Sequence, residues 1–222
     1  MVQTTRSPSA RVQRRQQRTR AELTRAAARI IATKGVDGLR LREVTDEADV
    51  GFGSFYNYFS SKEELVEAVV SDLAGAAAAA LGAQLAGYAD PAEAVCVAHR
   101  WLVRAAVEDP VGARLLVQLD HADVRLQERL LPLGVALMET GMTSGRFRPT
   151  DSPATTVSYL VGATLALMRA VLEGRVGPEA ESQTGVVMLQ ALGLDAADAH
   201  EIAYRDLPSA ALVDLSERTL SN

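Results

Sequence analysis

Four side chains suited to binding a nucleic acid lie between Ser54 and Lys62. Ser54 and Tyr56 carry hydroxyl groups, Asn57 carries an amide and Lys62 carries an ammonium group. Hydroxyl and ammonium groups bind phosphate oxygens, and an amide pairs best with the edge of an adenine. These residue types therefore favour binding of DNA over catalysis.

The other reactive side chains form no catalytic or metal-binding set. The three histidines, the scattered serines and Cys96 show no nucleophile and base at a defensible spacing. Asp120, His121 and Asp123 do not fall on one helix face, and no second histidine is near them in the sequence. We therefore expect no enzyme activity, no metal and no cofactor.

The elements that position the polar cluster form a helix, a tight turn and a second, short helix. Leu41, Val44 and Ala48 share one face of a helix expected over about 41–48. An aromatic helix is expected over about 53–59, with Phe55 and Phe59 buried one turn apart and Tyr56 and Asn57 facing outward. A short helix held at a fixed angle to a support helix can enter the major groove of DNA.

Two further helices are expected to flank this pair. The first begins near Thr19 and stops at Lys34 and Gly35, a basic residue followed by a glycine. The fourth is capped by Ser60 or Ser61, with two glutamates in its first turn, and continues through an alanine-rich segment. We therefore place the boundary between an N-terminal head and the rest of the chain inside the fourth helix.

The rest of the chain is also predicted to be helical. Apolar residues make up 48% of the sequence, aromatics only 5%, and no alternating strand pattern is visible. Proline and glycine divide this part into helices at about 91–108, 110–121, 123–144, 153–173, 178–192 and 195–206, with Pro132 expected to kink the third of these. The predicted fold class is all-α, with a helix-turn-helix head joined through a long helix to a larger helical domain.

Charge is segregated along the chain. The overall charge is −5, yet residues 1–70 hold 12 basic and 9 acidic residues, whereas residues 71–222 hold 11 and 19. A basic head on an acidic body fits a polyanion bound at one end. Residues 1–18 are expected to be a disordered basic arm, whose Arg14, Arg15 and Arg18 either contact DNA in the minor groove or along phosphates, or form a solvated tail.

The sequence shows no sign of secretion or membrane insertion. Cys96 is the only cysteine, which excludes an intrachain disulfide and favours a reducing compartment. The N-terminus is polar and arginine-rich, unlike a signal peptide. The apolar run from Thr156 to Leu172 is short for a membrane span and contains Arg169, so a buried helix and a cytoplasmic protein are expected.

Residues 19–70 resemble the N-terminal domain of the TetR (tetracycline-repressor-like) family of bacterial transcriptional regulators. The resemblance is carried by Gly53-Ser54-Phe55-Tyr56-Asn57-Tyr58-Phe59 and the following Ser61-Lys62-Glu63-Glu64-Leu65. It implies that Tyr56 and Lys62 contact phosphates. Together with the residues argued above, the predicted DNA-binding set is Arg40, Phe52, Gly53, Ser54, Tyr56, Asn57, Tyr58, Lys62, Arg14, Arg15 and Arg18, although Tyr58 could equally be core and Asn57 merely solvated.

Several positions depart from the family pattern. Arg40 stands where Ser or Thr often caps the second helix; arginine can replace the phosphate contact but not the cap. Asp49 stands where Gly is usual in the turn, and aspartate tolerates the left-handed conformation. Gly51 and Phe52 replace a frequent polar and basic pair, so the operator sequence cannot be inferred from relatives.

The resemblance implies that the helices at about 153–173 and 178–192 pair across a two-fold axis in a homodimer. Small residues in the first of these helices allow close helix approach. Two recognition helices about 34–36 Å apart would then read a palindrome. The predicted interface residues are Val157, Leu160, Val161, Thr164, Met168, Val186, Val187 and Leu189.

The helices between about 91 and 173 are expected to enclose a chamber for a small molecule. Aromatic and Met side chains would line it and a few polar groups would orient the ligand, although residues of these types are more often plain core. The candidates are Trp101, His99, Arg104, Gln118, His121, Met138, Met142, Phe147, Tyr159 and Met168.

The sequence thus predicts a ligand-responsive dimeric transcription factor that is released from a palindromic operator by a small apolar or amphipathic effector. A repressor is favoured over an activator, although the sequence alone does not give the sign of regulation. Its predicted parts are the arm at 1–18, the helix-turn-helix domain at 19–65, the ligand-binding and dimerisation domain at 66–210 and a tail at 211–222. Two alternatives remain open: a small-molecule-binding or enzymatic protein with a degenerate head, and a non-specific nucleoid-type DNA binder.

Overall fold

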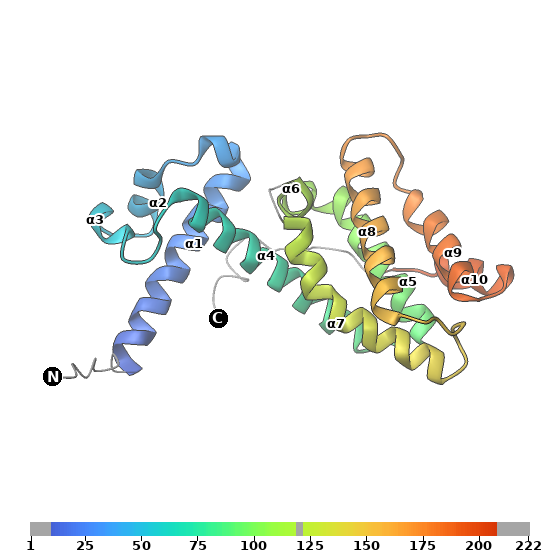
Figure 1. Cartoon of the computed structure of the whole chain (residues 1–222). Coiled ribbons are helices and arrows are strands. Elements are labelled where there is room, and N and C mark those ends of the chain that lie inside the picture. The colour runs from blue at the N-terminus through green and yellow to red at the C-terminus, as the bar shows by residue number, and fades with distance from the viewer. Residues whose placement is uncertain (1–9, 119–121, 208–222) are drawn as a thin grey trace. The chain divides into compact units, whose positions relative to one another are not determined.

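The computed structural model describes residues 10–118 and 122–207, and in these ranges it contains ten α-helices and no β-strand (Figure 1). The helices form two compact units that meet between Val69 and Val70. This junction lies inside α4 (Lys62–Leu85), a single helix, as the sequence predicts. The all-α prediction is confirmed.

The first unit contains α1 (Ala10–Gly38), α2 (Leu41–Glu47), α3 (Phe52–Phe55) and the beginning of α4. Its core is built from apolar residues that recur at helical spacing on these elements. The members that are almost completely buried include Leu23, Ile30, Ile31, Leu39, Val44, Phe55, Phe59 and Leu65.

Helix α1 starts nine residues earlier than the sequence predicts. Residues 11–18 are helical and exposed, so the prediction of a disordered arm is wrong for residues 10–18; residues 1–9 lie outside the described part of the chain. The physical reason is composition, because this segment consists largely of Arg and Gln, straight-chain residues that lose little side-chain freedom in a helix. The predicted stop is confirmed: Gly35 adopts a left-handed φ of 71° and breaks the helical geometry.

The turn between α2 and α3 follows the sequence argument closely. Asp49 has a φ of 52°, the only positive φ of a non-glycine residue in the described ranges, so aspartate does take the left-handed turn position. Arg40 precedes α2 without a side-chain capping bond, as expected. Helix α3 is shorter than predicted, because after Phe55 the chain continues as a turn in which the Tyr58 N–H donates to the Phe55 carbonyl oxygen at 2.9 Å.

Helix α4 begins with a reciprocal cap. The Glu64 N–H donates to Ser61 Oγ at 3.2 Å, while the Ser60 N–H donates to the Glu64 carboxylate at 2.7 Å. The hydrogen bonds from Ser60 lower the pKa of the Glu64 carboxyl, so Glu64 is ionised at neutral pH and favours the positive end of the helix.

The second unit contains the end of α4, then α5 (Pro91–Glu108), α6 (Pro110–Gln118), α7 (Ala122–Thr143), α8 (Pro153–Leu172), α9 (Ala180–Leu192) and α10 (Ala196–Ala203). These bounds lie within about three residues of the predicted ones. Helix α5 is central and packs against α6, α7, α8, α9 and α10. Asp90, Ser152 and Asp195 cap α5, α8 and α10 through side-chain oxygens.

Buried and half-buried ion pairs fix the ends of these helices. Arg146, after α7, donates to Asp90 at the start of α5 (2.9 Å) and to Asp198 in α10 (2.5 Å). These two carboxylates raise the pKa of the Arg146 guanidinium above its ordinary value. A second guanidinium, Arg100, is buried against Glu181 of α9 at 3.3 Å, so a single element, α5, anchors both clusters.

Close packing at Gly141 leads to a stability prediction. A Cβ added there would overlap Cδ2 of the buried Phe147 ring, so Gly141→Ala must displace that ring. We expect the substitution to lower the free energy of unfolding by about 1–3 kcal/mol in thermal or urea denaturation. Gly75→Ala is the control, because its Cβ would meet nothing within 4 Å. Equal unfolding curves for Gly141→Ala and wild type would contradict the packing described.

Candidate nucleic-acid interface and internal cavity

Two buried phenylalanines anchor helix α3 to the core of the first unit. Phe55 and Phe59 are buried, with ring centroids 5.7 Å apart, as predicted. The guanidinium of Arg20 lies 4.4 Å from the centroid of the Phe59 ring, which links α1 to the turn that follows α3. This arrangement fixes the direction in which the opposite side of α3 faces.

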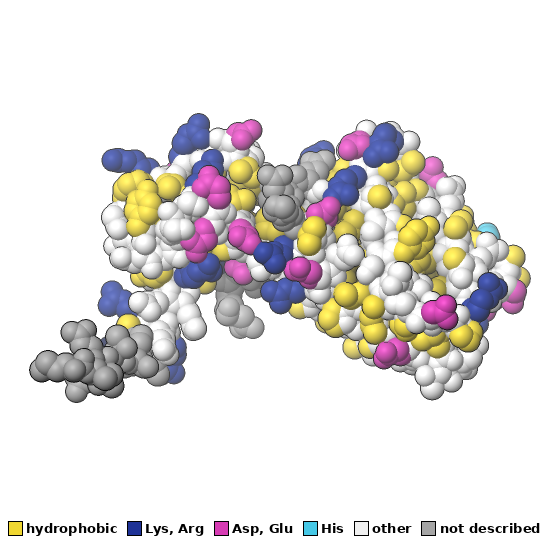
Figure 2. All heavy atoms as spheres, in the orientation of Figure 1, with side chains coloured by type: hydrophobic (Ala, Val, Ile, Leu, Met, Phe, Trp, Pro, Cys, Tyr) yellow, Lys and Arg dark blue, Asp and Glu magenta, His cyan; other side chains and the backbone are white. Residues whose placement is uncertain are grey.

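The outer side of α3 presents the predicted contact residues to solvent. Phe52, Gly53, Ser54 and Asn57 are exposed, and Tyr56 is 58% exposed. In Figure 2, basic side chains lie next to exposed hydrophobic atoms over the region of α2 and α3. A surface with hydroxyl, amide and aromatic groups beside positive charge is suited to the edges and phosphates of a duplex.

The other predicted contact residues of the head surround this surface. Arg40 is exposed and its guanidinium donates to the Asp37 carbonyl oxygen at 2.6 Å, Tyr58 is half-buried, and Lys62 occupies the first turn of α4. Arg42 was not among the predicted contact residues, yet its guanidinium lies 5.4 Å from the centroid of the exposed Phe52 ring. Its place on the exposed side of α2, two residues before the buried Val44, was the available signal.

The basic segment at the start of α1 forms a stripe. Arg11, Arg14, Arg15 and Arg18 recur at intervals of three and four residues, so they share one helix face. Like charges at this spacing repel, and positive charge is unfavourable at a helix N-terminus. Arg18 pairs with Glu22 at 2.9 Å. A polyanion would relieve the remaining repulsion.

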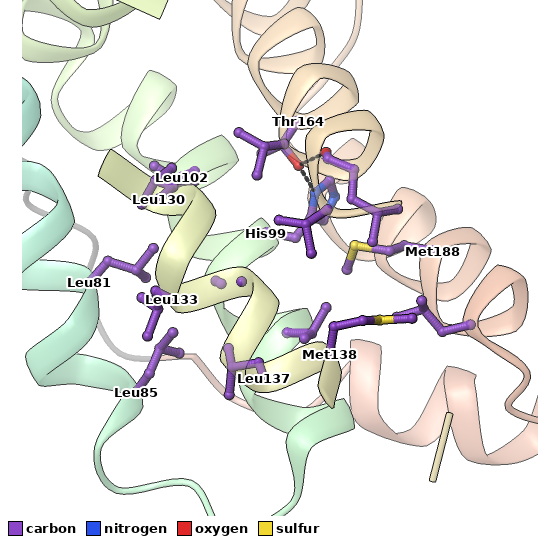
Figure 3. Close-up of a pocket in the computed structure, with 17 residues that line it drawn as sticks. Leu81, Leu85, His99, Leu102, Leu130, Leu133, Leu137, Met138, Thr164 and Met188 are labelled. Carbon is purple, nitrogen blue, oxygen red and sulfur yellow. Dashed lines mark hydrogen bonds between the residues drawn. The ribbon is translucent and has the colours of Figure 1, made fainter. Parts of the chain in front are cut away.

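The second unit contains a cavity of about 70 Å³ between α4, α5, α7, α8 and α9 (Figure 3). Its walls are almost wholly apolar. His99 and Thr164 lie together at one end, away from Leu81, Leu85 and Leu137. The lining residues in the described part of the chain are Leu81, Leu85, Val95, Ala98, His99, Leu102, Leu130, Leu133, Gly134, Leu137, Met138, Val157, Leu160, Val161, Thr164, Met188 and Leu192.

His99 links three helices at the polar end of the cavity. Its Nδ1 lies 2.8 Å from Thr164 Oγ1 on α8, and its Nε2 lies 2.7 Å from Thr184 Oγ1 on α9. Burial, assisted by the nearby Arg100 charge, lowers the pKa of His99 to about 4. The imidazole is therefore neutral at pH 7.

Two of the ten predicted ligand contacts, His99 and Met138, line this cavity. Tyr159 is 73% exposed on the outer face of α8, which corrects its predicted place in the chamber. Arg104 is engaged by Glu181 and by the Leu207 carbonyl oxygen. The buried Trp101, Phe147 and Met168 and the half-buried Met142 lie in the helix packing outside the lining; the Gln118 side chain and His121 lie outside the described residues.

The predicted dimer residues divide between two faces of α8 and α9. Val157, Thr164, Met168 and Leu189 are buried within the subunit, contrary to the interface prediction. Leu160 and Val161 line the cavity but are only half-buried, so for these two the interface stays a prediction. Val187 is 65% exposed and Val186 half-buried. An apolar pattern around the whole of α8 could not distinguish its inner from its outer face.

Two family profiles match this architecture. "Bacterial regulatory proteins, tetR family" matches residues 23–69, and "Tetracyclin repressor-like, C-terminal domain" matches residues 90–205. The chain belongs to the TetR family. Its head is thus the DNA-binding helix-turn-helix domain of a transcriptional regulator, and its second unit is a TetR C-terminal domain.

Individual TetR relatives agree with this assignment. The HTH-type transcriptional repressor KstR2 of Mycolicibacterium smegmatis is 27% identical over 177 residues, covering 75% of this chain and 84% of the relative. The crystal structure of RolR in complex with resorcinol is 31% identical, with a TM-score of 0.74, and covers 89% of this chain and 99% of RolR. A structure described as the molecular basis for control of antibiotic production by bacterial hormones is 27% identical with a TM-score of 0.58, covering 78% of this chain and 97% of that one.

The buried His99 predicts a pH-dependent stability of this TetR-family protein. The unfolded chain takes up a proton at His99 near pH 6.5, whereas the folded chain does so only near pH 4. The free energy of unfolding should therefore fall as the pH drops through this window, by at most about 1.4 kcal/mol per pH unit. Urea denaturation of wild type and His99→Gln between pH 4 and 7 checks this. Parallel curves for the two proteins would contradict a neutral buried His99.

Proposed function

We propose that this TetR-family regulator is a cytoplasmic repressor that binds a palindromic operator as a homodimer and leaves it when a small apolar or amphipathic molecule enters the cavity. The observation that carries the proposal is the outward set of Ser54, Tyr56 and Asn57 on a support formed by the buried Phe55 and Phe59. The repressor assignment is supported by the likeness to KstR2.

The DNA contacts divide by chemistry. Asn57 is the candidate for reading a base edge, and Tyr56 and Lys62 are candidates for phosphate contacts. The arginine stripe at Arg14, Arg15 and Arg18 extends the basic surface along α1, and as a helix it is better suited to a row of phosphates than to threading a minor groove.

The outer face of α8 and α9 supports homodimerisation. An 18-residue window of α8 has a mean hydropathy of 1.4, yet only 22% of it is buried within the subunit. Length and composition alone would let α8 cross a membrane, but membership of this family favours a second copy as the cover. Tyr159 and Val187 are the large exposed apolar residues, and the exposed Ala163 and Ala166 allow close approach of helices.

The cavity supports a small effector. Apolar lining with two polar side chains at one end is typical of a ligand site, and RolR, whose structure contains resorcinol, is similar over almost its whole length. The cavity is about half the size of one that accommodates benzene, roughly 150 Å³, so side chains must move on binding. Leucine and methionine side chains in the wall, such as Leu133 and Met188, can make this adjustment.

Helix α4 supports the coupling between effector and DNA. Its first turn carries Lys62 in the head, and its last two turns carry Leu81 and Leu85 in the cavity wall. A ligand that displaces these leucines would bias the position of α4. For release to follow, the ligand must bind the DNA-free state better, and by linkage the operator weakens ligand binding by the same factor.

Selection from random double-stranded DNA by the purified protein tests the function. We expect a palindrome with half-sites about one helical turn apart. Asn57→Ala should relax the preference at one position of each half-site, whereas Asn222→Ala, far from the head in sequence, should recover the wild-type motif. Recovery of no preferred sequence by a folded dimer would contradict the proposal and favour a degenerate head.

The arginine stripe predicts the salt dependence of operator binding. Replacing Arg14, Arg15 and Arg18 together by Gln should weaken binding and flatten the slope of log K against log [salt] by about 1 for each phosphate that the variant no longer neutralises. The matched control replaces the exposed Arg114, Arg129 and Arg175 of the second unit by Gln, with the same change in net charge. Equal slopes for the two triple variants would show that the stripe does not touch DNA.

The proposed interface predicts the oligomeric state. Val187→Asp places a charge on the outer face of α9 and should shift a dimer toward monomer in sedimentation velocity, because an unpaired charge would be buried there. Val124→Asp is the control, since the Val124 side chain is also exposed, at 50%, but lies on α7, outside the proposed interface. Dimers of unchanged stability in Val187→Asp would place the interface elsewhere.

A further inference from the structure

We propose that the effector is an uncharged molecule whose polar group is a hydrogen-bond donor such as a hydroxyl, and that this group donates a hydrogen bond to Thr164 Oγ1. The inference rests on the proposed function, because it takes the cavity of the second unit as the effector site. It adds the chemical class of the ligand and the atom that recognises it.

The lining excludes a charged group. Among the lining residues that the structure describes there is no Lys, Arg, Asp or Glu, and only His99 and Thr164 of them place polar side-chain atoms in the cavity (Figure 3). A carboxylate or an ammonium group would lose its hydration without gaining a counter-ion, which is strongly unfavourable in an apolar site. The neutral imidazole of His99 supplies no charge either. The ligand's polar group must therefore be neutral.

Counting hydrogens shows which kind of neutral group fits. Thr164 Oγ1 lies 2.8 Å from His99 Nδ1 and 2.9 Å from the Leu160 carbonyl oxygen. Its single hydrogen goes either to that carbonyl, with Nδ1–H donating to Thr164, or to an unprotonated Nδ1. In both arrangements the hydrogen is used inside the protein and at least one lone pair of Oγ1 remains free. Thr164 can thus accept a further bond, and the ligand must bring the donor.

His99 is a positioning residue in this arrangement. Its other nitrogen, Nε2, lies 2.7 Å from Thr184 Oγ1, so the ring is held at both ends between α8 and α9. A ring held in this way fixes the orientation of the Thr164 hydroxyl. The same hydroxyl oxygen also lies 2.9 Å from the Leu160 carbonyl oxygen of its own helix. The free lone pair is therefore oriented before the ligand arrives, which limits the entropy lost on binding.

Four probes of similar size separate the possibilities: phenol donates, anisole only accepts, toluene does neither and benzoate is an anion. Their affinities for the full-length protein are measured by calorimetry with wild type, Thr164→Val, Thr164→Ser and Thr155→Val, the last being an exposed threonine of the same helix. Thr164→Val should weaken phenol binding roughly three- to tenfold, the effect of removing one hydrogen bond, and change toluene binding less than twofold. Thr164→Ser should recover most of the phenol affinity, and Thr155→Val should match wild type.

If Thr164→Val only changed the shape of the cavity, it would weaken the binding of phenol and of toluene by the same factor. That result would overturn the proposal. So would benzoate or anisole binding as tightly as phenol to wild type, or no phenol binding to wild type at all. The same preparations are used to select DNA. A palindrome recovered together with any of these outcomes would overturn only the ligand chemistry, whereas absence of a palindrome would count against the proposed function itself.

Discussion

The head depends on the burial of two aromatic rings beneath a helix that could not exist alone. Helix α3 has four residues, about one turn, and an isolated helix of this length is unstable in water. Phe55 and Phe59 hold it against the unit by burying their rings, and this fixes the outward direction of Tyr56 and Asn57. The outward orientation of these polar side chains is therefore a consequence of apolar packing. Loss of either ring would leave Tyr56 and Asn57 without a fixed orientation.

Helix α8 imposes a second constraint, because it serves two surfaces at once. Its inner face, with Val157 and Thr164, forms part of the cavity wall, and its outer face, with Tyr159, is exposed to a second copy in the proposed dimer. A molecule that moves the inner face must therefore also disturb the outer one. Together with α4, which contributes Leu81 and Leu85 to the same cavity, this gives an effector two helices through which to act.

The sequence predicted the helices of the second unit well because proline, glycine and capping residues such as Asp90 and Ser152 mark their ends. It predicted which side chains of the recognition segment are exposed because Phe55 and Phe59 define a buried face by spacing. It failed where a pattern is symmetric or weak. Helix α8 is apolar all round, so its faces could not be assigned, and the leucines that line the cavity look like ordinary core. The helical start of α1 was not predicted, because dense positive charge is typical of a disordered arm, whereas the Arg and Gln residues of this segment have high helix propensity.

The central claim, that two heads are held at operator spacing and move when an effector binds, can be tested by the distance between them. The only native cysteine, Cys96, is buried, and burial raises its pKa to about 12, so a spin label will attach selectively to an introduced Asp46→Cys on the exposed side of α2. Pulsed dipolar spectroscopy of the proposed homodimer should give a single narrow distribution of label-to-label distances on the selected operator, and a shifted or broader one once phenol has released the DNA. Absence of any dipolar coupling, or one distribution unchanged by operator and by phenol, would contradict the account.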